Sequence, residues 1–64
     1  MMLKIYALVV WVEETGEFKN ASQPAVNEEL AAEVFEMMYG NQVKIVHIFE
    51  GEHPPKTYRS LPYI

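Results

Sequence analysis

The most hydrophobic stretch of the chain lies near its start, where both alternating sets of positions are apolar. Residues 3–12 are rich in Ile, Val, Tyr and Trp, which favour strands. The odd positions from Ile5 to Trp11 are apolar, and so are the even positions from Tyr6 to Val12. Because successive side chains of a strand point to opposite faces, both faces need a cover. We therefore expect this strand at the centre of a sheet.

A turn and a more polar strand follow. Gly16 suits a hairpin turn, because glycine adopts a positive φ at no steric cost. Residues 18–21 predict a short returning strand at the sheet edge. The next element is a helix whose start has two candidates: Ser22 as N-cap with Pro24 in the first turn, or Asn27 as a rival N-cap.

The helix has a clear amphipathic pattern. It is predicted to run to Tyr39 and to stop at Gly40-Asn41, because glycine readily takes the conformation that ends a helix. One half of the helical wheel is apolar, and we expect it to be buried, with the two methionines as adaptable core residues. This half consists of Val26, Leu30, Ala31, Val34, Phe35, Met37 and Met38. The other half contains a cluster of three glutamates, Glu29, Glu33 and Glu36.

A third strand and a proline-rich tail complete the chain. Residues 42–49 predict the strand, which Gly51 ends. By alternation, one of its faces carries Val43, Ile45, His47 and Phe49. Residues 54–64 contain three prolines, which exclude a helix or a central strand. We expect this tail to be extended and polyproline-like.

This order of elements, β-β-α-β, predicts an α+β fold of two layers. A hairpin followed by a right-handed crossover places the first strand between the other two, in the order 2-1-3 of a mainly antiparallel sheet. Residues 1–53 then form one domain, and residues 54–64 form its tail. The helix covers one face of the sheet. The other face needs the tail, a second copy of the chain or another protein, and we expect a homodimer through it.

Length and charge narrow the classes of function. A chain of 64 residues forms one domain, whose own core supplies only about 3–5 kcal/mol. Cysteine is absent, so disulfides and thiolate metal sites are excluded. Residues 1–53 carry a net charge of −6 and residues 54–64 a net charge of +2, giving −4 in all. Nucleic-acid-binding proteins normally carry a basic patch, so we expect no direct nucleic-acid binding and a basic protein partner instead.

The start of the chain does not have the pattern of a targeting segment. A short apolar run follows Lys4, but Glu13 and Glu14 stand where a small-residue cleavage site would lie. No stretch approaches the roughly 20 apolar residues of a membrane helix. We expect a cytoplasmic protein that does not bind a membrane.

The residues that usually carry chemistry do not form a recognisable site. His47 and His53 form the pattern His-x2-Glu-x-Glu-His with two glutamates, which are metal-ligand types. Strand alternation sends His47 and Glu50 to opposite faces, so we expect no metal, and we place His47 at a sheet edge or an interface, where its titration could make association pH-sensitive. The chain has no Cys, no Asp and no glycine-rich phosphate loop. We therefore expect no enzyme and no cofactor.

Three segments resemble a pattern common in small bacteriophage and plasmid proteins. They are Glu28-Glu29-Leu30-Ala31, Met38-Tyr39-Gly40 and Val43-Lys44-Ile45-Val46. In that pattern a hairpin leads to an amphipathic helix that ends in Tyr-Gly, and a short strand follows. The short phage inhibitors of bacterial RNA polymerase are similar in length and element order. The resemblance spans residues 4–50 and implies a host-directed binding protein that sets an acidic strip against a basic surface.

The candidate interaction residues are acidic or aromatic. They are Glu29, Glu33, Glu36, Trp11, Tyr6, Tyr58 and Tyr63. The glutamates either keep the helix soluble or dock on a basic surface, which includes nucleic-acid mimicry, and Trp11 suits the core as well as an interface. We predict a small acidic non-enzymatic protein-interaction or regulatory module. The alternatives are a structural or accessory subunit of a larger assembly, and a small ligand-binding protein or enzyme with a site at a dimer seam.

Overall fold

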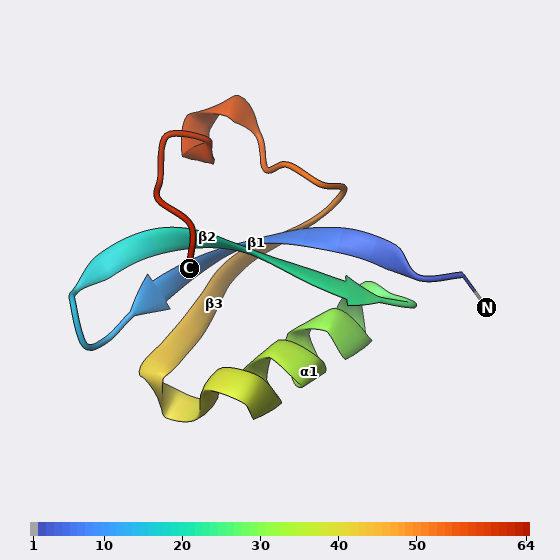
Figure 1. The fold of residues 1–64 in the computed structure, drawn as a ribbon, viewed down its shortest axis with the longest axis horizontal. Coiled ribbons are helices and arrows are strands. Elements are labelled where there is room, and N and C mark those ends of the chain that lie inside the picture. The colour runs from blue at the N-terminus through green and yellow to red at the C-terminus, as the bar shows by residue number, and fades with distance from the viewer. Residues whose placement is uncertain (1) are drawn as a thin grey trace.

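The computed structural model describes residues 2–64 and has three strands, one α-helix and two short 3₁₀ turns. In chain order the elements are β1 (Lys4–Val12), β2 (Glu17–Ala25), α1 (Glu28–Tyr39), η1 (Gly40–Gln42), β3 (Val43–Glu50) and η2 (Lys56–Tyr58). The strands form one antiparallel sheet in the order β2-β1-β3. The predicted α+β fold and strand order are therefore confirmed, with β1 in the centre. Figure 1 shows α1 on one side of the sheet and the tail on the other.

The second strand is longer than the sequence pattern predicts. β2 pairs with β1 along its whole length, from the pair Lys4 and Ala25 to the pair Val12 and Glu17. A proline fits within β2 because the outer side of an edge strand needs no N–H donor. The helix consequently starts later than the candidate at Ser22. Asn27 is the N-cap, and its side-chain oxygen accepts a hydrogen bond from the Leu30 N–H at 2.8 Å.

The helix packs on the sheet through a narrower stripe than its apolar half-wheel. Ala31 and Phe35, one turn apart, are its buried residues. They lie over the buried side chains of the sheet's helix-facing side, which are Tyr6, Leu8, Val10, Ala21, Ala25 and Val43. The prediction that Met37 and Met38 belong to the core is wrong, since these side chains are 80% and 66% exposed. A sheet of three strands is too narrow to bury the whole apolar half of the helix surface.

A β-bulge changes the faces of β3. The pairing register shifts between two neighbouring residues of β1, so that Val9 lies opposite His47 and Val10 lies opposite Ile45. Val46 is the extra residue. Before the bulge, the odd-numbered residues Val43 and Ile45 face α1. After the bulge, the even-numbered residue Ile48 faces α1. The prediction that Val43, Ile45, His47 and Phe49 share one face is therefore wrong, because the bulge turns the last two toward the tail.

The tail lies over the sheet face opposite α1 and covers part of it. Pro54 is buried, and the Tyr58 ring packs on the rings of His47 and Phe49, with centroids 5.3 Å and 5.9 Å apart. The tail is not extended throughout, because η2 makes a 3₁₀ turn in it. Of the three candidate covers for this face, the structure contains the first. On the same face Phe18 and Val46 remain 46% and 44% exposed beside the tail, so the expected homodimer through this face stays a prediction.

Candidate interaction site

An apolar stripe remains exposed along one flank of α1. Leu30, Val34, Met37 and Met38 form it, with 40%, 38%, 80% and 66% of their surfaces exposed. Residues spaced by three, four or seven positions lie on the same side of a helix, so the four side chains follow one line. Scattered apolar residues are normal on a protein surface, but a contiguous set on one helix is typical of a contact surface.

An acidic strip lies beside the apolar stripe. It consists of Glu29, Glu33 and Glu36, all of which are exposed. The ion pairs within residues 2–64 join Lys4 to Glu50 at 3.6 Å and Lys44 to Glu13 at 3.3 Å, so they involve none of the three. The last turn of the helix contains no basic residue. The acidic strip therefore carries negative charge that no cation of the described chain neutralises.

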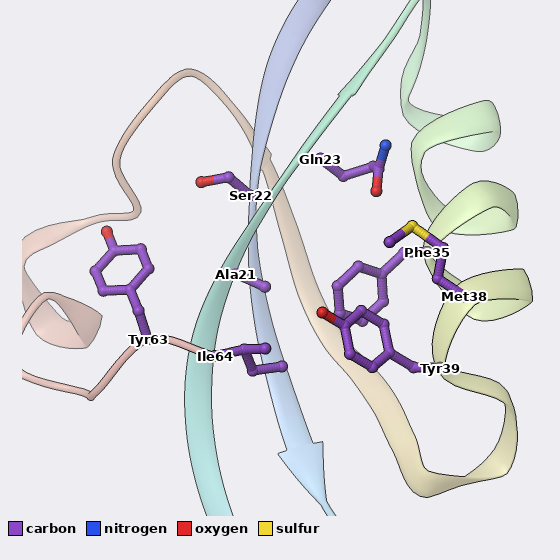
Figure 2. A pocket seen from close by; sticks show the side chains of 8 residues that line it. All are labelled: Ala21, Ser22, Gln23, Phe35, Met38, Tyr39, Tyr63 and Ile64. Carbon is purple, nitrogen blue, oxygen red and sulfur yellow. The ribbon is translucent and has the colours of Figure 1, made fainter.

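A pocket of about 260 Å³ opens at the C-terminal end of the apolar stripe, between α1, β2 and the end of the tail. Figure 2 shows Phe35, Met38 and Tyr39 reaching from α1 toward β2, with Ile64 beside them from the tail. The Phe35 and Tyr39 rings pack with their centroids 4.5 Å apart. The remaining lining residues are Ala21, Ser22, Gln23 and Tyr63. The pocket thus adjoins the apolar stripe through Met38.

The adjacent edge of β2 offers little room for an added strand. The Asn20 N–H donates to the Pro62 carbonyl at 2.8 Å, and the Asn20 carbonyl accepts from the Ile64 N–H at 2.9 Å. Asn20 and Tyr63 form a parallel bridge through these bonds. Four residues further along the strand, Pro24 has no N–H to donate. The β2 edge beside α1 is therefore closed to main-chain pairing at Asn20 and lacks a donor at Pro24.

The predicted interaction residues do not form one surface. Tyr6 is only 3% exposed and belongs to the core beneath α1. Trp11 packs edge-to-face on Phe18, with ring centroids 4.8 Å apart, on the tail side of the sheet. Tyr58 belongs to the tail and packs on His47 and Phe49, and of the predicted residues only Tyr63 borders the pocket beside α1. The acidic strip is thus the part of the prediction that shares a surface with the apolar stripe.

The structure also contains an anchor for the tail that the sequence pattern does not reveal. Asn20 is fully buried, and its Nδ2 donates to the carbonyl oxygens of Tyr58 and Leu61 at 2.8 Å and 3.3 Å. Its Oδ1 has no hydrogen-bond partner in the described chain. Asparagine in a polar edge strand predicts solvent exposure, and only the contact with residues about 40 positions later explains its burial.

Neither a metal-binding cluster nor a membrane-spanning helix occurs within residues 2–64: no three His or Glu side chains lie close enough to hold an ion, and α1 is too short and too polar to cross a bilayer. Comparison with known proteins finds no matching family model, no similar curated protein and no similar solved structure.

Proposed function

We propose that the protein is a non-enzymatic interaction module that binds a basic amphipathic segment of a partner protein along α1. The observation that carries this proposal is the apolar stripe of α1 beside the unneutralised acidic strip. A helix or strand segment with apolar side chains on one face and Lys or Arg on its flank fits both features at once. This mode of binding is recognition of an amphipathic segment by a groove beside a helix.

The two parts of the site contribute differently to binding. Burial of one Met or Leu side chain stabilises a complex by roughly 1.5–3 kcal/mol, and methionine adapts its shape to different partners. Met37 and Met38 are the most exposed of the stripe and gain most from a partner. Glutamates at the rim of an interface chiefly raise the association rate and orient the partner. Affinity therefore comes mainly from the apolar stripe, and selection of a basic partner comes from the acidic strip.

The sequence resemblance agrees with this binding mode. The short phage inhibitors that the chain resembles set an acidic strip against a basic protein surface. The segments that carry the resemblance include Glu28-Glu29-Leu30-Ala31 and Met38-Tyr39-Gly40, which belong to α1. A host-directed regulatory role would use the same surface of the helix.

A titration with a synthetic peptide tests the proposal. The probe is a 20-residue amphipathic peptide with leucines on one face and lysines on the other, and calorimetry measures its affinity. We expect the wild-type protein to bind it and the variant Glu29→Lys/Glu33→Lys/Glu36→Lys to lose at least tenfold in affinity, because three attractive charges become repulsive.

The matched control reverses three other exposed glutamates, in Glu14→Lys/Glu17→Lys/Glu52→Lys. This control changes the net charge by the same amount but leaves α1 untouched, so we expect it to retain most of the affinity. Equal losses in both variants would show that the peptide responds only to net charge. Equal binding by the wild type and the α1 variant would also contradict the proposal.

A further inference from the structure

The outer edge of β3 is open, in contrast to that of β2. β3 is an edge strand of eight residues. Among residues 2–64, no backbone group of a turn, the helix or the tail bonds to its outer side. A row of unpaired N–H and C=O groups is a template for pairing with another strand. The tail protects the β2 edge at Asn20, and no segment of the described chain protects the β3 edge in the same way.

The hydrogen bonds at the two ends of β3 show which positions face outward. The Gly51 N–H donates to the Ile5 carbonyl at 2.8 Å, and the Glu13 N–H donates to the Gln42 carbonyl at 3.0 Å. Residues 42 and 51 thus face β1, and main-chain groups alternate between the two sides of an antiparallel strand. Counting inward from each end to the bulge, the outward positions are Val43, Ile45, Ile48 and Glu50.

We propose that β3 pairs antiparallel with β3 of a second copy of the chain and forms a continuous six-stranded sheet. In the register that matches, Ile45 lies opposite Ile48 of the second copy and Val43 lies opposite its Glu50. Every outward-facing position of one strand then meets an outward-facing position of the other. The contact is isologous and closes as a two-fold dimer.

The bulge makes this register selective. The outward positions Ile45 and Ile48 are three residues apart and not two, because Val46 is inserted between them. A strand without a bulge would lose its hydrogen-bond register with β3 at this point. The β3 strand of a second copy carries the same extra residue at the centre of the pairing. The outward-facing N–H and C=O groups of the two strands therefore match on both sides of the bulge. A register slip of one residue would set outward groups against inward ones. The bulge, which blunts an edge against most strands, thus favours a second copy.

The side chains on both faces fit the same register. Val43, Ile45 and Ile48 all contact the core beneath α1, so the pairs of isoleucines extend that core across the two-fold axis. On the tail side, Lys44 lies opposite Phe49 of the second copy. At the centre, Val46 is 44% exposed and becomes covered. A domain of this length buries a smaller share of its surface than a larger domain does, and association is a common way to add stability.

Sedimentation and amide hydrogen exchange of the full chain test the dimer. We expect a dimer at micromolar concentrations, with slow exchange at the Ile45 and Ile48 amides that becomes faster on dilution. Val46→Lys should weaken the dimer about tenfold or more, because it sets two like charges beside the two-fold axis. The control Val34→Lys introduces the same charge on α1 and should leave the dimer unchanged.

A second variant guards against effects on the monomer. Glu50→Pro removes an outward N–H that the chain's own sheet does not use, so it should weaken the dimer while its circular dichroism stays native. A monomer at millimolar concentration, or a dimer whose Ile45 and Ile48 amides exchange as fast as exposed ones, would overturn the proposal. Neither outcome bears on peptide binding at α1.

Discussion

The two layers that cover the sheet are held in different ways. The tail is held by hydrogen bonds of the buried Asn20 and by aromatic packing of Tyr58 on His47 and Phe49. The helix is held by apolar contacts, with Ala31 and Phe35 at their centre. The tail is thus a short segment whose backbone carbonyls accept the hydrogen bonds that hold it to the sheet. The helix buries one stripe and leaves the next exposed, which is why we place the binding surface on the helix.

The largest effect is expected from removing the apolar anchor of the helix layer. Phe35→Ala should lower the free energy of unfolding by about 3–5 kcal/mol, because it leaves a cavity between α1 and the sheet. In a domain this small, such a loss comes close to unfolding the protein. Urea denaturation followed by circular dichroism measures it. A loss below 1 kcal/mol would show that the helix is not held by this side chain.

Removal of the tail's anchor should cost less and act locally. Asn20→Ala deletes two side-chain hydrogen bonds to the tail backbone, which we expect to lower stability by about 1–3 kcal/mol. Amides of residues 54–64 should exchange faster, while those of α1 keep their protection. Gln23→Ala serves as the control, because its hydrogen bond to the Pro24 carbonyl is exposed. Equal loss of protection in both layers would mean that tail and helix unfold as one unit.

The start of the helix should contribute still less. Asn27→Ala removes the hydrogen bond from the Leu30 N–H to the Asn27 side chain, and we expect a loss of about 1 kcal/mol. Ser22→Ala, at the rejected N-cap position, should change the stability by less than about 0.5 kcal/mol. Thermal unfolding of the two variants compares them directly. A larger effect of the Ser22 change would place the helix start earlier than the structure does.

A small effect on stability is expected where the effect on binding is largest. Met37→Lys/Met38→Lys replaces two exposed side chains on a helix surface, so stability should change by only about 0.5 kcal/mol per residue. Affinity for a basic amphipathic peptide should fall at least tenfold. Unfolding of the double variant would contradict this prediction, because it would mean that the two methionine side chains belong to the core.

Local patterns were sufficient to predict the order of the elements. The two apolar sides of β1 place it in the centre, and Gly16 and Gly40 mark the turn and the helix end. The extent of β2 was not predictable, because its polar residues and Pro24 do not look like a strand and owe their conformation to pairing with β1. No residue type marks the bulge at Val46 either, since valine is common in regular strands.

The candidate site was predictable only in part. The spacing of Glu29, Glu33 and Glu36 indicates a polar face, and the structure places it at the surface. The exposure of Met37 and Met38 depends on the width of the sheet beneath the helix, which a helical wheel does not contain. The burial of Asn20 depends on a contact with the tail and is equally invisible in the local pattern.

The claim that α1 is the binding surface is tested most directly by the side-chain methyl resonances of Met37 and Met38 during titration with the basic amphipathic peptide. The account predicts that both resonances shift and saturate together, while those of Leu61 in the tail stay unchanged. Shifts at Leu61 with unchanged methionines would place binding on the tail layer and contradict it.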